Sequence, residues 1–405
     1  MAQNFLVHRG SRPSGGRFAP CHPLERVPAP SPNLSQQYRE TYTVKKMNKA
    51  TNKKAILVLE NGSIYEGSSC GIDGEKTGGV SFYTGVVGYQ EVISTPSNAG
   101  KIMVMTYPLI GNYGVAKKFW ESQSPWVAGL IIKENSRIAS NWQAEGKLAD
   151  FLKDEKVLAI EKVDTRALMV ELRQNGEQWG IISTRDFGLE SLKRKIKQAK
   201  EAKFDFIKKI STKKIVKLSG QGKKVVIIDI GVTKSLVNQF TCLGCQLKLI
   251  PYATAACDIL ALSPQGIIIS DGPEMDKGIY VVVDTVKQLL GKLPILGIGT
   301  GCQIIAMAMG LKTKRMRLGH HGLNYPVIKP GVFKGEITQQ NHSWVIDETS
   351  IKDKDIEITW RNLNDQTIEG IQNTKLNAFG CQFYPASPGV REVNPILKEF
   401  IGLLG

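Results

Sequence analysis

Hydrophobic residues first fall into a regular pattern near residue 54. The runs KKAILVLE and SIYEGSS are typical of short strands, and Asn61-Gly62 between them suits the positive φ angles of a tight hairpin turn. Strand-like runs continue to WVAGLIIKE. The run VDTRALMVELRQNG, with apolar residues three and four apart, predicts a helix before the strand WGIIST. We expect a β-rich α/β domain over residues 54–185.

A second pattern begins near residue 223. KKVVIIDIG is a continuous apolar run ended by glycine, and GIIISDGP and PILGIG are further runs separated by helical stretches. Strands that are apolar throughout and alternate with helices indicate a mainly parallel sheet with both faces covered by helices. In such sheets functional groups collect at the carboxyl ends of the strands. We therefore expect a second α/β domain over residues 223–405, with SDGP and GIGTG at its functional edge.

The net charge of +16 lies outside these two domains. Residues 1–54 hold ten basic and two acidic residues, and residues 185–224 hold fourteen and four, so the rest of the chain sums to about −2. The segment ESLKRKIKQAKEAKFDFIKK lacks the aromatic interleaving of single-strand-binding proteins. We expect residues 186–222 to be a solvated lysine-rich linker and predict no nucleic-acid partner.

The first 53 residues are rich in Ser, Pro and Arg and have no apolar periodicity. This composition predicts a disordered extension. Met47 is a plausible true start, which gives a cytoplasmic protein, whereas residues 1–46 acting as a transit peptide would place it in a plastid or mitochondrion. No apolar run reaches the length of a membrane span. Cys242 and Cys245 form one CxxC without a second pair, so we predict no zinc or redox site there.

Longer strings of residues then point to a family. The first domain contains GYQEVISTPSNAG, TYPLIGNYGV and VDTRAL, and the second contains SDGP, GIGTGCQ, GHHGLNYPV, QQNHSWVID and CQFYPASPGV. In these strings, which span residues 54–405 in order, the chain resembles the small subunit of carbamoyl phosphate synthetase. The resemblance implies a class I glutamine amidotransferase-like second domain in a ligase family, and no cofactor. It also implies a heterodimer with a large subunit that makes carbamoyl phosphate for arginine or pyrimidine biosynthesis.

The resemblance also implies a Cys-His-Glu triad on a strand-to-helix elbow. The nucleophile position is Gly299, the base position is Tyr384, and the orienting glutamate is missing after Pro385, where the chain continues to Ala386. A thiol near its free pKa is mostly protonated at neutral pH, so a nucleophilic cysteine needs a basic partner. No histidine follows His342. We expect no intact catalytic residue and no glutamine hydrolysis, so the chain would be a pseudoenzyme with respect to glutaminase activity.

The glutamine pocket that the resemblance implies is partly altered. Its retained positions are Gly272, Thr300, Gln303 and Asn341, and its substituted positions are Gly85, Glu274, Ser343 and Trp344. Glu274 matters most, because it places a carboxylate where a glycine backbone should approach the substrate. Several changes at one small-molecule site, within a retained scaffold, predict that the site has stopped working.

The remaining reactive side chains have plainer interpretations. Cys302 follows the elbow by about one helical turn, so we expect it, like Cys381, to pack in the core. His320 and His321 are adjacent on an extended segment and should point to opposite faces. We expect no acidic or cysteine ligand cluster to accompany them or His342, and therefore structural hydrogen bonds and no metal.

Three functions follow from these observations. The leading one is a structural or regulatory partner of a large subunit that uses free ammonia. A second is a stand-alone binding protein that uses the remodelled pocket, with Glu274, Trp344 and Tyr384, for a cationic or aromatic molecule. The third is a glutamine-dependent subunit that acts through unrecognised residues, for which loss of activity in Cys302→Ala would be the sign.

Overall fold

The computed structural model describes residues 53–202, 204–389 and 392–405, which all belong to one compact unit. The predicted N-terminal extension lies, except for its last residue, outside the described residues, so the start and the compartment stay predictions. The division of the chain into domains at residues 185 and 222 likewise stays a prediction. No helix in the described residues is long and apolar enough to cross a membrane.

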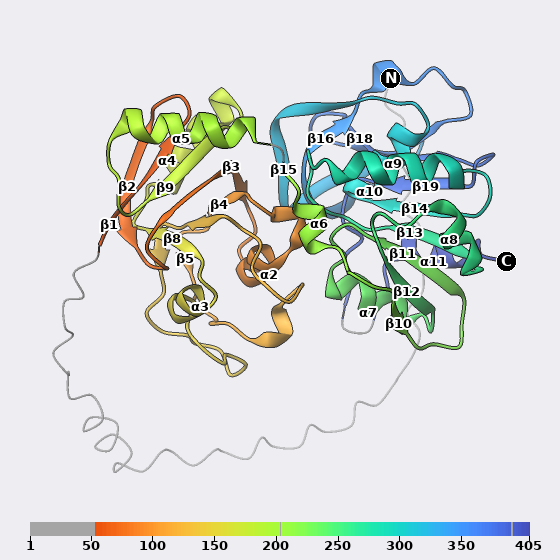
Figure 1. The fold of residues 1–405 in the computed structure, drawn as a ribbon, viewed down its shortest axis with the longest axis horizontal. Coiled ribbons are helices and arrows are strands. Elements are labelled where there is room, and N and C mark those ends of the chain that lie inside the picture. The colour runs from red at the N-terminus through yellow and green to blue at the C-terminus, as the bar shows by residue number, and fades with distance from the viewer. Residues whose placement is uncertain (1–52, 203, 390–391) are drawn as a thin grey trace, which may run out of the picture. The chain divides into compact units, whose positions relative to one another are not determined.

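The first half of the described chain is built on a closed barrel (Figure 1). Its strands, in barrel order, are β1 (Lys54–Leu59), β2 (Ile64–Ser69), β8 (Leu158–Glu161), β6 (Gly129–Ile131), β4 (Ile102–Met105), β3 (Glu75–Tyr83) and β9 (Trp179–Ser183). Strands β1 and β2 pair antiparallel across the predicted turn, where Gly62 has φ +97°. The predicted hairpin is confirmed.

Short helices and strands lie between the barrel strands along the chain. They are α2 (Tyr89–Ser94), η1 (Pro96–Asn98), β5 (Leu109–Ile110), η2 (Lys117–Phe119), β7 (Glu134–Asn135), α3 (Leu148–Asp154) and α4 (Thr165–Asn175). The Asp164 side chain accepts a hydrogen bond from the backbone N–H of Ala167 and so caps α4, as an N-cap residue does. Leu168 and Leu172, four apart, are buried in the barrel core. The predicted helix is confirmed.

The lysine-rich segment is more ordered than the solvated linker that its charge suggests. It contains α5 (Leu189–Glu201), α6 (Phe206–Ile210) and β10 (Val216–Leu218). Leu192 and Ile196 lie four apart on α5 and pack against Ile56, Val58 and Ile181 of the barrel. Ile207 of α6 is buried in the core of the second half. A sparse apolar stripe is enough to bury one face, while the lysines stay on the other.

A ten-stranded sheet forms the second half. Its order is β10, β12 (Gln246–Pro251), β11 (Lys224–Asp229), β13 (Gly266–Ile269), β14 (Ile295–Ile298), β19 (Ala378–Cys381), β18 (Ile368–Asn373), β17 (Glu357–Asn362), β15 (Thr313–Ile328) and β16 (Glu336–Ile346). From β12 to β19 neighbouring strands are parallel, and the remaining pairs are antiparallel.

Helices cover both faces of the parallel part of this sheet. The helices are α7 (Lys234–Cys242), α8 (Ala256–Ala261), α9 (Gly278–Leu289), α10 (Thr300–Ala308) and α11 (Pro395–Gly402), with η3 (Glu348–Ser350) beside them. Along β11, Val226 and Ile228 enter one core with α9, whereas Val225 and Ile227 enter the other with α7 and α11. This two-sided burial explains why the strand is apolar throughout and confirms the predicted fold class.

Sheet order also positions the site. Strands β13 and β14 are parallel neighbours, with Ile269 opposite Gly297, so both chains leave the sheet at the same edge. The SDGP turn after β13 therefore faces the GIGTG turn after β14, as parallel pairing requires.

Candidate functional site

The elbow that the sequence predicts is present. Strand β14 ends at Ile298, Gly299 has φ +57° and ψ −118°, and α10 begins at Thr300. A Cβ atom at Gly299 would lie 2.3 Å from Oδ1 and 2.6 Å from Cγ of Asp271. Glycine therefore suits this position for two reasons: it tolerates a positive φ, and it leaves room for the Asp271 carboxylate.

Asp271 belongs to this site although the sequence analysis passed over it. Its Oδ1 accepts a hydrogen bond of 3.0 Å from the backbone N–H of Thr300, and the Thr300 hydroxyl donates to the carbonyl of Gly272 at 2.7 Å. Burial raises the pKa of Asp271. The hydrogen bonds from the backbone N–H groups of Thr300 and Gly272 lower this pKa, but burial outweighs them. The N–H group at the elbow tip, a position that stabilises oxyanions in acyl-transfer sites, already has an internal acceptor.

Glu274 occupies the second half of the site. Its carboxylate accepts hydrogen bonds from the backbone N–H groups of Ser343 (2.9 Å) and Trp344 (3.0 Å) and from Nε2 of Gln303 (3.0 Å). The Lys101 Nζ lies 3.9 Å from Glu274 Oε2, and the glutamate side chain is only 6% exposed. Three donors thus converge on one carboxylate that belongs to the chain itself.

Asn341, another position that the resemblance assigns to the pocket, is also hydrogen-bonded within the chain. Asn341 donates through Nδ2 to Ser97 Oγ and Asn98 Oδ1, and its Oδ1 lies 2.8 Å from Nδ1 of His321. Ser97 and Asn98 come from the first half of the chain. Asn341 therefore ties the two halves together across the site.

No base occupies the two positions where the resemblance implies the histidine and the glutamate. The Tyr384 hydroxyl lies 2.8 Å from Thr233 Oγ1 and 2.7 Å from Ser235 Oγ. Burial raises the pKa of this phenol further above its ordinary value. Ala386 makes hydrogen bonds only through its backbone: its N–H donates to the Tyr384 carbonyl, and its carbonyl accepts from Asn394 Nδ2.

The two cysteines near the elbow are core residues, in agreement with the sequence analysis. Cys302 is fully buried with Ala306, Leu311 and the apolar residues of β18, and Cys381 is buried in the core beneath α11. Burial raises the pKa of the Cys302 thiol well above its usual range and that of Cys381 to about 12. Thiols of this kind are inert.

Two cavities flank the site. A small one of about 90 Å³ lies against Lys101, Glu274 and Trp344. A larger one of about 570 Å³ is lined by Asp271, Asn341, Tyr384 and Glu91, among others. The Glu91 Oε2 atom is buried without a hydrogen-bond partner, and burial raises the pKa of Glu91 to about 7.

The substituted positions fall around these cavities. Gly85 lies in the turn before α2, where a Cβ would meet the Tyr83 ring at 2.5 Å, and Tyr83 lines the larger cavity. Ser343 Oγ lies 3.2 Å from His321 Nε2. The structure therefore gathers Glu274, Ser343 and Trp344 with Gln303, while Tyr384 lines the larger cavity and Gly85 lies against Tyr83 at its edge.

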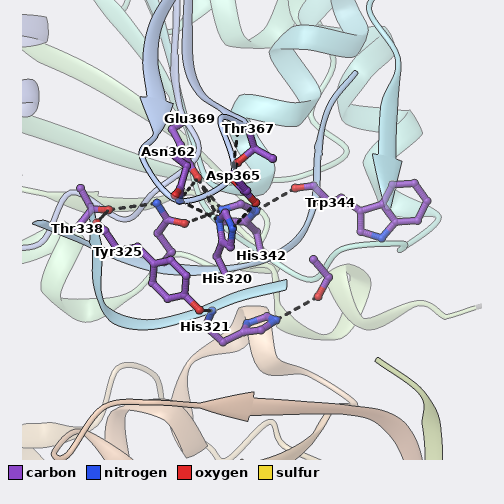
Figure 2. Close-up of polar contacts among 12 residues, drawn as sticks. His320, His321, Tyr325, Thr338, His342, Trp344, Asn362, Asp365, Thr367 and Glu369 are labelled. Atoms are coloured by element: carbon purple, nitrogen blue, oxygen red, sulfur yellow. Dashed lines mark hydrogen bonds and ion pairs between the residues drawn. The ribbon is translucent and has the colours of Figure 1, made fainter. Parts of the chain in front are cut away.

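The histidines behave differently from one another (Figure 2). His321 contacts Glu177, Asn341 and Ser343, whereas His320 points the other way, as the prediction of opposite faces requires. The expectation that no acidic residue accompanies the histidines is wrong. His320 lies 3.1 Å from Glu369 Oε1 through Nδ1 and 3.0 Å from Asp365 Oδ2 through Nε2.

This pairing shifts the pKa of His320. Burial lowers that pKa, but the hydrogen bonds with Asp365 and Glu369 outweigh burial and raise it to about 9. No local pattern indicates this pairing, because Glu369 reaches His320 only through the sheet order that places β18 near β15.

Comparisons with known proteins agree on the family. The family described as carbamoyl-phosphate synthase small chain, CPSase domain, matches residues 57–182, and that described as glutamine amidotransferase class-I matches residues 226–403. The solved structure of a glutamine amidotransferase from Thermotoga maritima is 15% identical to this chain, with a TM-score of 0.32, and the match covers 40% of this chain and 76% of that one.

Curated relatives match over nearly their whole length. The carbamoyl phosphate synthase small chain of Syntrophotalea carbinolica is 38% identical over 368 residues, which cover 87% of this chain and 98% of that protein. The carbamoyl phosphate synthase pyrimidine-specific small chain of Halalkalibacterium halodurans is 38% identical over 352 residues, or 87% of this chain and 97% of that protein. The chain belongs to the carbamoyl phosphate synthase small chain family.

Proposed function

We propose that this chain is a carbamoyl phosphate synthase small chain that does not hydrolyse glutamine. In this proposal it is a structural or regulatory partner of a large subunit that uses free ammonia, in arginine or pyrimidine biosynthesis. The observation that carries the proposal is the carboxylate of Asp271, which fills the space beside Gly299 and accepts the N–H of Thr300.

Amide hydrolysis by covalent catalysis needs a nucleophile, a base and donors for the oxyanion. Gly299 supplies no nucleophilic atom. The Tyr384 phenol has a raised pKa and is hydrogen-bonded to two hydroxyls, so it is a poor base for a nearby group. The N–H of Thr300 already donates to Asp271 Oδ1, so this donor is not free for an oxyanion.

Binding of glutamine is disfavoured by the same kind of contact. The donors at Gln303, Ser343 and Trp344 already bind Glu274, which is tethered to the chain and needs no association entropy. An amino-acid carboxylate would have to displace this group and then lie beside its charge. The site therefore resembles a pocket whose ligand is part of the protein.

Partnership with a large subunit is supported by the extent of the family match. The two relatives named above are small chains by name, and this chain spans 98% and 97% of them, including the barrel half.

The test is carbamoyl phosphate formation by a cognate large subunit, alone and mixed with this chain, with glutamine or ammonium as nitrogen source. We expect the chain to raise the ammonium-dependent rate and to give no glutamine-dependent rate. A glutamine-dependent rate that Cys302→Ala removes would instead support a subunit that acts through unrecognised residues. No effect with either source would count against a role as partner.

A second candidate function is binding of a small cation. The Glu274 carboxylate is not free for this, because its oxygens are occupied, but the cavity of about 570 Å³ offers Asp271, Tyr384 and the unpartnered Oε2 of Glu91. Calorimetric titration with methylammonium and benzylammonium tests it. Binding that Glu91→Gln weakens would favour this function, and no binding of either cation would remove it.

A further inference from the structure

Three strands bring a histidine pair and a carboxylate together in the second half of the chain (Figure 2). His320 of β15 pairs directly with His342 of β16, and Glu369 lies on β18. All three side chains are buried, with residue exposures of 6%, 2% and 0%. One ligand atom from each lies within 4.8 Å of the other two.

The outer hydrogen bonds fix which ring nitrogens carry protons. His342 Nδ1 lies 3.0 Å from the carbonyl oxygen of Trp344, which can only accept, so Nδ1 is protonated. His320 Nε2 lies 3.0 Å from the carboxylate of Asp365, so Nε2 is protonated. In neutral imidazoles the lone pairs then lie on His342 Nε2 and His320 Nδ1.

Both lone pairs face Glu369. His320 Nδ1 lies 3.1 Å from Oε1, and His342 Nε2 lies 3.5 Å from Oε2. Asn362 Nδ2 donates to Glu369 Oε1 at 3.1 Å and also lies 3.3 Å from His320 Nδ1. Glu369 Oε2 is fully buried without a hydrogen-bond partner. Acceptors that face each other in a dry site repel, so a proton or a cation is needed between them.

We propose that His320 Nδ1, His342 Nε2 and a Glu369 oxygen bind one divalent transition-metal ion of the zinc class. Two imidazoles and a carboxylate are a ligand set of this class. Asp365 and the Trp344 carbonyl take the second ring N–H of each histidine, which is the outer arrangement that orients metal-binding imidazoles. The ion balances the charges of Glu369 and Asp365 while both imidazoles stay neutral.

Such an ion would be structural and independent of the question of glutamine hydrolysis. It would join β18 to the β15–β16 pair, and β16 carries Asn341, Ser343 and Trp344. Gln340 Oε1, 3.2 Å from His342 Nε2, is the neighbouring oxygen that can complete the ligand set. The competing state has no metal and two imidazolium rings between the two carboxylates.

Titration with Co²⁺ tests the proposal. The full chain carries Cys21→Ser, Cys242→Ser and Cys257→Ser, because Cys242 and Cys257 are exposed thiols and Cys21 lies outside the described residues. After treatment with a chelator, we expect one equivalent of Co²⁺ per chain, a visible spectrum typical of four-coordinate cobalt, and displacement by Zn²⁺. No bound cobalt or zinc would overturn the proposal.

Variants locate the ion. Glu369→Gln and His342→Gln should abolish stoichiometric binding, and Asp365→Asn should weaken it about 10–100-fold. His321→Gln is the matched control, because His321 is equally buried but points away from the cluster, and it should keep one equivalent. Binding that survives Glu369→Gln and His342→Gln would place the ion elsewhere and reject this site.

A measurement on the unaltered chain covers the case in which these variants fail to fold. Nuclear magnetic resonance of ring-¹⁵N-labelled histidine distinguishes neutral, metal-bound and doubly protonated rings. We expect two metal-bound imidazoles in the presence of Zn²⁺. Two imidazolium rings in zinc-saturated protein would establish the competing state.

Discussion

Buried carboxylates meet different surroundings at the elbow and at the histidine cluster. At the elbow, Asp271 and Glu274 receive hydrogen bonds from backbone N–H groups, which are fixed donors. In the cluster, Glu369 faces imidazole nitrogens whose protons depend on the state of the site. The elbow is therefore satisfied without a ligand, whereas the cluster is satisfied only with protons or a cation.

The largest expected effect concerns the space beside the elbow. Gly299→Cys should lower the free energy of unfolding by about 1–3 kcal/mol for strain at positive φ and by about another 1–3 kcal/mol for the clash with Asp271. Gly310→Cys is the matched control, since Gly310 has φ +85° and nothing within 4 Å of a Cβ. Urea denaturation compares the two.

Equal losses of unfolding free energy in these two variants would mean that the Asp271 side chain can move away from position 299 at little cost. The elbow would then have room for a nucleophilic side chain, and the conclusion that Asp271 closes this site would be wrong. The variant Gly299→Cys should also remain without glutaminase activity, because no base is placed beside it.

A third buried carboxylate, that of Glu91, should make the stability of the protein depend on pH. Glu91 is an acid whose pKa burial raises to about 7, so its neutral form is favoured in the folded state. The native protein should lose about 3 kcal/mol relative to Glu91→Gln as pH rises from about 4.5 to 7, and the loss should stay constant above pH 7.

Unfolding in urea at pH 5 and pH 8 measures this difference. The exposed Glu190→Gln variant should show no such pH dependence. If Glu91→Gln is no more stabilising at pH 8 than at pH 5, the Glu91 carboxylate has a hydrogen-bond partner in solution, which contradicts its unpartnered Oε2 in the structure.

The smallest effect on stability is expected at Glu274. Glu274→Gly should cost about 1–3 kcal/mol, because the donors at Gln303, Ser343 and Trp344 lose a charged acceptor but gain access to water. The same variant should bind L-glutamate in a calorimetric titration, whereas the native chain should not. Glutamate binding by the native chain would show that Glu274 does not occupy the pocket.

Local pattern predicted much of the fold but little of the long-range chemistry. The uniform apolar run of β11 indicated a strand buried on both faces, and Asn61-Gly62 indicated a turn, because each depends on neighbours in sequence. The burial of Leu192 and Ile196 was hidden among lysines that only the fold turns outward.

The candidate site, like the fold, could be predicted only where it depends on residues close together in sequence. The elbow at Gly299 follows from a strand, a glycine turn and a helix in succession, so the sequence located it. The partners Asp271 and Glu369 come from other strands, and their roles depend on sheet order and side-chain direction, which no local pattern contains.

The most direct test of the central claim is the release of ammonia from amide-labelled glutamine by this chain in complex with its large subunit. We expect no release above that of the large subunit alone, because in the proposed function Asp271 and Glu274 take up the hydrogen-bond donors that glutamine would need. Sustained turnover that depends on the small chain would contradict it.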